Sequence, residues 1–315
     1  MCQPCRMRFL PGLLRAVGAG AVAGAALTAY GVWETRQYTL RRYDVRTLPA
    51  GMRPLRVLHL SDIHMTPGQA AKQAWISDLA ALRPDLVVDT GDNLAHRDAV
   101  PVVLDTLSGL LDRPGVFVHG SNDYFEPGLR NPLGYLLPDD GKRHTDVAEL
   151  PWRDLTAGLT DAGWVDLTNR RATLEVGEAR LAFAGVDDPH LDYDDLAAVA
   201  GPAEPDADLR LGVAHAPYLR VLDQFARDGY DGIIAGHTHG GQVCLPGGRA
   251  LTTNCDLEPA RARGLHRHPA ESREGETGSS WMHVSAGLGT SPYARVRVAC
   301  RPEATVLTLL PRAGA

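Results

Sequence analysis

Five short polar motifs in the sequence combine the residue types that hold metal ions in proteins. Each motif directly follows an apolar stretch, and together they place aspartate, asparagine and histidine at Ser61-Asp62-Ile63-His64, Thr90-Gly91-Asp92-Asn93, His119-Gly120-Ser121-Asn122-Asp123, Ala214-His215-Ala216-Pro217 and Ala235-Gly236-His237-Thr238-His239-Gly240-Gly241. Carboxylate and imidazole groups suit manganese, iron and zinc, and these motifs contain no cysteine. The motifs therefore predict a site for divalent cations.

The spacing within the motifs indicates how the side chains would meet. Asp62 and His64 are two residues apart, as are His237 and His239, so each pair points the same way on an extended segment. Asp92 is a single carboxylate that can bridge two ions with one oxygen each. Two cations about 4 Å apart clamp a phosphate and activate a water molecule as a nucleophile. This pattern favours hydrolysis of a phosphate ester.

The elements that must position these motifs alternate between strand-like and helical patterns. Short apolar runs predict strands at 55–60, 86–88 and 116–118, with helices at 70–82 and 100–111 between them. This order is typical of an α/β unit with a parallel sheet, in which ligands bind beyond the carboxyl ends of the strands. A second set of elements, which suggests a second sheet packed on the first, comprises strands at 180–185, 209–214, 232–235, 283–286 and 305–310 and a helix at 218–228. Loops are expected at 126–150 and 258–280.

The order of the motifs, from D-x-H through G-D-N and a lone histidine to G-H-T-H, resembles the calcineurin-like metallophosphoesterases over residues 55–310. The resemblance implies an α/β fold, a four-layer α/β/β/α sandwich with both metals at one edge of the two sheets. It implies a first metal held by Asp62, His64, Asp92 and His239, and a second held by Asp92, Asn122, His215 and His237. It also implies that a metal-bound hydroxide hydrolyses phosphodiesters, pyrophosphates or phosphomonoesters.

The third motif departs from the family pattern, which is usually Gly-Asn-His followed by an acidic residue. A gapless alignment puts Ser121 in the ligand place and Asn122 in the histidine place. We prefer Asn122 as the ligand, because an amide oxygen is the better donor to a hard cation. The catalytic histidine is then missing, and protonation of the leaving group falls to Asp123, to another histidine or to water. Asp92, Asn122 and Asp123 are therefore the candidate catalytic residues, and a degenerate protein that binds metal or ligand without turnover is the alternative.

The N-terminal segment predicts a membrane attachment. Residues 1–33 contain an uncharged run flanked by arginines, which suits a single-pass anchor, although a cleaved signal peptide or a soluble helix fits the same pattern. Residues 34–52 are expected as a polar linker and 53–315 as the metallophosphoesterase domain. The family subgroup that the chain most resembles contains membrane-anchored bacterial phosphodiesterases related to lipid-nucleotide hydrolases. We therefore expect the domain at the cell membrane, outside the cytoplasm.

The charge of the chain bears on its partners. The 315 residues carry a net charge of −6, so no nucleic-acid partner is expected. The expected partners are a phosphorylated small molecule or lipid head group, and a membrane that the N-terminal helix contacts.

Overall fold

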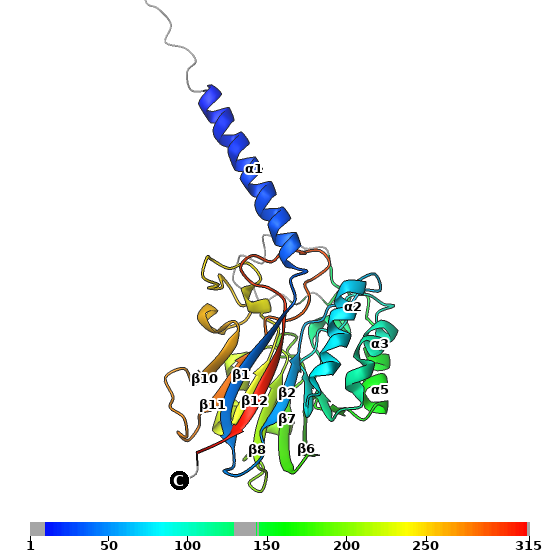
Figure 1. Cartoon of the computed structure of the whole chain (residues 1–315), viewed down its shortest axis with the longest axis vertical. Helices are drawn as coiled ribbons and strands as arrows, with labels where there is room; N and C mark the ends of the chain where they lie inside the picture. Colours follow the sequence, from blue (N-terminus) through cyan, green and yellow to red (C-terminus); the bar gives the residue numbers. More distant parts are fainter. Residues whose placement is uncertain (1–9, 129–142, 144, 314–315) are drawn as a thin grey trace, which may run out of the picture.

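The computed structural model describes residues 10–128, 143 and 145–313, without the side chains of residues 10–17 (Figure 1). Twelve strands form two six-stranded sheets with the orders β1-β12-β2-β3-β4-β5 and β10-β11-β9-β8-β7-β6. The strands are β1 (Thr39–Leu48), β2 (Leu55–Leu60), β3 (Leu86–Asp89), β4 (Gly115–Phe117), β5 (Val165–Asp166), β6 (Arg170–Val176), β7 (Ala179–Gly185), β8 (Leu209–Ala214), β9 (Gly232–Ala235), β10 (Gly264–His268), β11 (Ser280–Val284) and β12 (Glu303–Pro311).

Helices cover the outer faces of both sheets. The described helices are α1 (Leu10–Glu34), α2 (Ala70–Ser77), α3 (Val100–Leu111), α4 (Ser121–Tyr124), α5 (Trp152–Asp161), α6 (Leu196–Val199) and α7 (Leu219–Arg227), with 3-10 turns η1 (Asp78–Leu82), η3 (His239–Gly241) and η4 (Pro259–Arg261). Helices α2, α3 and α5 pack on the first sheet through Ile76, Leu107 and Leu155 (Figure 1). Helix α7 packs on the second sheet through Val221 and Phe225.

A third apolar cluster fills the space between the two sheets. It contains Val57 and Val88 of the first sheet and Leu181 and Leu211 of the second, all fully buried. Strands buried on both faces read as nearly continuous apolar runs, which is why these short strands were detectable in the sequence. The layers therefore run helix, sheet, sheet, helix, and the predicted four-layer α/β/β/α sandwich is confirmed.

The central strands of each sheet are parallel, so their carboxyl ends share one edge. Leu60 at the end of β2 pairs with Asp89 of β3, and Phe117 of β4 pairs with the same residue. In the second sheet, Ala214 of β8 pairs with Ala235 of β9. All five motifs consequently begin at one edge of the sandwich.

Several segments differ from the sequence-based expectation; one is the strand expected at 305–310 in the second set of elements, which forms part of β12 in the first sheet. Residues 39–48, expected as part of the 34–52 linker, form β1, which pairs in parallel with β12. The predicted 258–280 loop contains β10, which is antiparallel to β11. Strands β1 and β10 are edge strands, where solvated charged side chains are common and hide the alternation that marks a strand. The domain therefore begins before residue 53, and the linker prediction is wrong for 39–48.

Helix α1 projects away from the sandwich and meets it only near its C-terminal end (Figure 1). Among the described residues, none of the helices combines the length and apolar character needed to cross a membrane, so the predicted span is not confirmed. Residues 1–9 of the predicted anchor and residues 129–142 and 144 of the predicted 126–150 loop lie outside the described residues.

Candidate metal centre

The loops that follow β2, β3, β8 and β9 are joined to one another by backbone hydrogen bonds. The Asp62 N–H donates to the Gly91 carbonyl at 2.8 Å, and the His64 N–H donates to the Asp92 carbonyl at 2.9 Å. The Gly236 N–H donates to the His215 carbonyl at 2.8 Å. These bonds join motifs within each sheet, and the His237 N–H, which donates to Asp62 Oδ2 at 3.1 Å, joins a motif of the second sheet to one of the first.

Five of the seven predicted metal ligands have a left-handed backbone. The φ angles are 50° for Asp62, 44° for His64, 57° for Asp92, 66° for His237 and 50° for His239. Residues other than glycine seldom adopt this region, which costs on the order of 1–3 kcal/mol each and persists where the surrounding structure enforces it. Such concentrated strain is typical of a functional site.

Four side chains form a compact buried cluster at the first predicted metal position. One candidate ligand atom from each of Asp62, His64, Asp92 and His239 lies within 4.8 Å of the other three. The Nε2 atoms of His64 and His239 are 3.2 Å apart, and Asp62 Oδ1 is buried without a hydrogen-bond partner. A cation between these atoms would satisfy all of them, so the residues fit a divalent metal.

Backbone carbonyls fix which nitrogen of three histidines faces the centre. Nδ1 of His239 lies 3.2 Å from the Gly289 carbonyl, and Nδ1 of His215 lies 2.7 Å from the Thr90 carbonyl. His237 contacts the Asn254 carbonyl through Nε2 at 3.1 Å. A carbonyl only accepts, so these contacts favour a proton on the contacting nitrogen, and the other nitrogen of each ring is the one that can bind a cation once it is deprotonated.

The remaining predicted ligands lie around Asp92, with the two histidines on the side of Oδ1 and the Asn122 side-chain amide nearest Oδ2. His215 Nε2 lies 3.6 Å from Asp92 Oδ1, and His237 Nδ1 lies 3.3 Å from His215 Nε2. The Asn122 N–H donates to Asp92 Oδ1 at 2.7 Å, and its Nδ2 lies 2.8 Å from Asp92 Oδ2. A half-turn of the amide exchanges its nitrogen for its oxygen, which would then face the same space. This arrangement suits the predicted second metal, which stays a prediction.

The structure corrects the catalytic role predicted for Asp123. Its buried carboxylate accepts backbone N–H groups at 2.8–3.2 Å from Gly120, Asp92, Asn93 and Leu94. Burial alone would raise the pKa of Asp123, but His119 and these donors outweigh burial and hold the pKa below its usual value. The carboxylate is therefore ionised at neutral pH and fully used by the backbone, so it cannot protonate a leaving group.

Burial perturbs the titration of the remaining acids and histidines. It raises the pKa of Asp62 and raises that of Asp92 to about 6, and it holds the pKa of His64 and His239 well below the usual value. Burial opposes the charged form of His215 as well, but the neighbouring carboxylates outweigh it and raise the pKa to about 9. Crowded acids that share a buried space favour a cation among them.

Two glycines allow the motifs to approach so closely. A Cβ on Gly236 would lie 1.9 Å from Ser61 Oγ and 2.8 Å from Asp62 Oδ2. A Cβ on Gly120 would lie 2.4 Å from Asp92 Oδ1. Any side chain at either position would therefore push a candidate ligand out of place.

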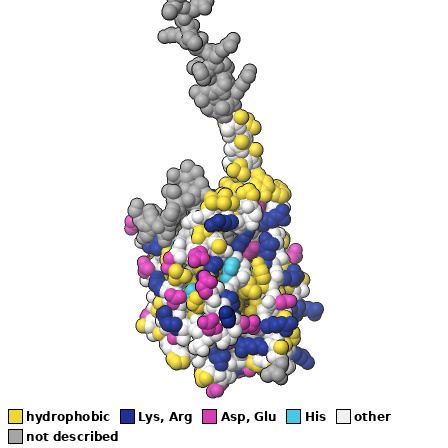
Figure 2. All heavy atoms as spheres, turned by 90° about the vertical axis from the view of Figure 1, so that its left-hand side faces the viewer, with side chains coloured by type: hydrophobic (Ala, Val, Ile, Leu, Met, Phe, Trp, Pro, Cys, Tyr) yellow, Lys and Arg dark blue, Asp and Glu magenta, His cyan; other side chains and the backbone are white. Residues whose placement is uncertain are grey.

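The surroundings of the centre include the segment of residues 187–190. The His190 ring lies 4.5 Å from the His237 ring, and Asp188 is fully buried nearby with its pKa raised to about 7 by burial. Histidine side chains reach the surface among acidic ones on the face shown in Figure 2.

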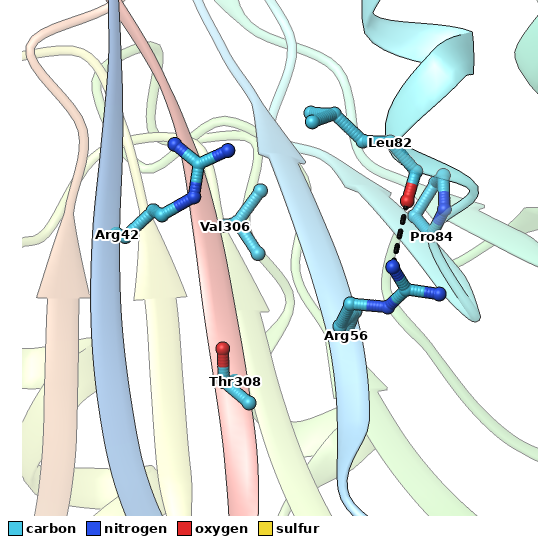
Figure 3. A pocket seen from close by; sticks show the side chains of 6 residues that line it. All are labelled: Arg42, Arg56, Leu82, Pro84, Val306 and Thr308. Carbon is cyan, nitrogen blue, oxygen red and sulfur yellow. Dashed lines mark hydrogen bonds between the residues drawn. The ribbon is translucent and has the colours of Figure 1, made fainter.

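A separate hollow at β1, β12 and β2 contains no candidate ligand and is lined by Arg42, Arg56, Leu82, Pro84, Val306 and Thr308 (Figure 3).

Sequence analysis missed Arg297, which lies against the centre. This arginine is fully buried and donates to the carbonyls of Ala286 and Gly289, both at 2.7 Å. It lies 58 residues beyond His239 in the sequence and follows no strand directly, so no local pattern marks it.

Comparison with known proteins shows the family of the chain. A model of the calcineurin-like phosphoesterase family matches residues 55–241, and the chain therefore belongs to this family. The chain is 25% identical to the metallophosphoesterase YkuE of Bacillus subtilis over 332 aligned residues, which cover 98% of this chain and 99% of YkuE.

More distant similarities extend to an animal protein and to a solved structure. A bovine transmembrane protein with a metallophosphoesterase domain is 27% identical over 210 residues, 63% of this chain and 43% of that protein. The crystal structure of TT1561 from Thermus thermophilus is similar with a TM-score of 0.41 and 11% identity, covering 75% of this chain and 91% of that one. The assignment to the family rests on the family model.

Proposed function

We propose that this protein hydrolyses phosphate esters with the help of two divalent cations bound around Asp92. The observation that supports this most is the convergence of three motifs on one buried carboxylate. Atoms of His64, His215 and Asn122 lie within 3.6 Å of its two oxygens. Members of the family act on phosphoesters, and the arrangement of the candidate ligands in this chain supports the same chemistry.

The ligand set suits manganese, iron or zinc. Such cations, when bound, supply a Lewis-acid clamp for the phosphate and make water a stronger nucleophile. The first would be held by Asp62, His64, Asp92 and His239, and the second by Asp92, Asn122, His215 and His237. The carbonyls of Thr90, Asn254 and Gly289 keep the histidine rings oriented, which maintains the ligand geometry.

The third motif bears on which leaving groups are tolerated. Asn122 is followed by Asp123, whose carboxylate is occupied by backbone donors. His119 is buried, and its Nε2 lies 2.8 Å from Thr156 Oγ1, so it is not a substitute for the missing histidine. General acid catalysis contributes about 10²–10⁴ in rate. We therefore propose substrates with good leaving groups, such as pyrophosphates or activated esters.

Features of α1 support a membrane-linked substrate. Val22, Leu27, Tyr30, Val32 and Trp33 are exposed on this helix. Apolar side chains also gather where α1 meets the domain (Figure 2). Aromatic residues of this kind favour the membrane interface. We propose that α1 contacts a membrane and that the domain lies on the side of this membrane away from the cytoplasm. We also propose that the substrate is a lipid-linked phosphate or diphosphate.

The test is an assay of bis-p-nitrophenyl phosphate hydrolysis with manganese. We expect manganese-dependent turnover in the wild type and a loss of roughly 100-fold or more in His237→Ala, because several kcal/mol of metal-derived stabilisation is removed. The rate over a series of aryl esters should depend steeply on the pKa of the leaving group. The same assay with a lipid-linked diphosphate and a soluble dinucleotide distinguishes the two substrate classes.

Equal background hydrolysis by the wild type and His237→Ala would contradict this function. Together with tight manganese binding, that outcome would favour a protein that binds metal or ligand without turnover. A flat dependence on the leaving-group pKa would contradict the inferred lack of a general acid.

A further inference from the structure

The C-terminal end of α1 is built into a loop of the domain, residues 289–300. The Gly31 carbonyl accepts the Arg297 N–H at 3.1 Å, and a Cβ on Gly31 would lie 2.5 Å from Val296 Cγ1. Glu34 is only 2% exposed, and its two carboxylate oxygens accept the N–H groups of Ala299 at 3.0 Å and Cys300 at 2.9 Å. The helix therefore ends in a buried carboxylate that binds this loop.

The same loop holds the backbone of the last metal motif. The Cys300 thiol lies 3.2 Å from the His239 carbonyl and 3.5 Å from the Gly240 carbonyl. The Val298 N–H donates to the Gln242 carbonyl at 3.0 Å. Loop 289–300 thus lies between the end of α1 and the turn that contains His239.

Arg297 connects this loop to the His239 side chain. One guanidinium nitrogen donates to the Gly289 carbonyl at 2.7 Å, and His239 Nδ1 lies 3.2 Å from that same oxygen. The other terminal nitrogen contacts the carbonyls of His239 at 3.4 Å and Cys300 at 3.3 Å. Arg297 forms no ion pair within the described part of the chain, and its hydrogen bonds go mainly to carbonyl oxygens, beside contacts with Cys300 Sγ at 3.8 Å and His239 Nδ1 at 3.3 Å. Such an arrangement requires the loop to keep one conformation, because a displaced carbonyl leaves a buried charge unsatisfied.

We propose that Glu34 is a positioning residue for the metal centre. Its carboxylate fixes the backbone at Ala299 and Cys300, which holds Arg297 and the Gly289 carbonyl, which in turn orient His239 toward His64. In this view, the end of α1 both attaches the helix to the domain and supports the first metal position. The inference rests on the proposed function only in assuming that His239 binds a metal.

The experiment is a titration of the metal-free full chain with Mn²⁺, in which isothermal calorimetry measures binding. We expect Glu34→Ala to weaken one class of binding site about 10–100-fold, the usual effect of losing a group that supports a ligand, and to leave the other class unchanged. Glu34→Gln keeps one acceptor oxygen and should recover part of the loss. Glu178→Ala is the matched control, since Glu178 also accepts a distant backbone N–H, that of Arg53 at 3.0 Å, away from the metal motifs.

Several outcomes decide the matter. Wild-type Mn²⁺ affinity at both classes of site in Glu34→Ala would overturn the proposal, and a lowered unfolding temperature in that variant would then show that Glu34 only attaches α1. If Glu34→Ala does not fold, Glu34→Gln carries the test with the same expected direction. A wild-type chain that binds no Mn²⁺ would overturn the proposed function itself, and the positioning role with it.

Discussion

Replacing Asp92 by asparagine should lower manganese-dependent phosphodiester hydrolysis by roughly 1,000-fold or more. Among the acids that the structure describes, Asp92 alone has oxygens that face both clusters of candidate ligands, at 3.5 Å from His64 Nε2 and 3.6 Å from His215 Nε2. An amide removes the charge that the two proposed cations would require, and several kcal/mol of lost stabilisation corresponds to this factor at about 1.36 kcal/mol for each tenfold change. The measurement is kcat/KM for bis-p-nitrophenyl phosphate.

Asp44→Asn is the control for this variant, because Asp44 is an exposed acid on β1. It should leave kcat/KM unchanged. An Asp92→Asn protein that keeps more than a tenth of the wild-type rate, with an unchanged circular dichroism spectrum, would contradict a bridging role for Asp92.

Replacing Asp123 by alanine should lower the stability of the fold, and not only the rate of the reaction. The substitution leaves four backbone N–H groups without their acceptor in a site where Asp123 itself is fully buried. Each unsatisfied buried donor costs about 1–3 kcal/mol, and because water relieves part of this cost we expect a loss of roughly 4 kcal/mol or more. Urea unfolding of the metal-free protein, monitored by circular dichroism, measures this loss.

Asp105→Ala, at an exposed position of α3, provides the comparison and should change stability by less than about 0.5 kcal/mol. If Asp123→Ala were as stable as the wild type but inactive, Asp123 would have a direct chemical role and its assignment as a structural acceptor of backbone N–H groups would be wrong.

The positions of most ligands could be predicted because strand ends are local signals. The sequence runs before Asp62, Asp92 and His215 are short, apolar and largely buried, and each stops at a polar residue. In a parallel arrangement these ends must share an edge. The strand boundaries of β2, β8 and β9 agree with the expected ranges to the residue.

Other features depend on tertiary contacts that leave no local pattern. The sequence of β1 shows no clear alternation of apolar and polar residues. Its charged side chains lie at the exposed edge of the sheet, and only Val45 and Leu48 reach the core. Asp123 follows the candidate ligand Asn122 directly and has the right chemistry for an acid, and only its four backbone contacts exclude that role. Arg297 is a further case, since its link to the metal motif is a contact with the carbonyl of His239, 58 residues earlier in the sequence.

Metal content is the most direct test of a two-cation site around Asp92. The full chain, purified with manganese in excess and then freed of unbound ions, should contain two equivalents of metal by inductively coupled plasma mass spectrometry. Asp92→Asn should contain fewer than one. A wild-type protein with no bound metal, or an Asp92→Asn variant that retains two equivalents, would contradict the claim that this carboxylate lies between two bound cations.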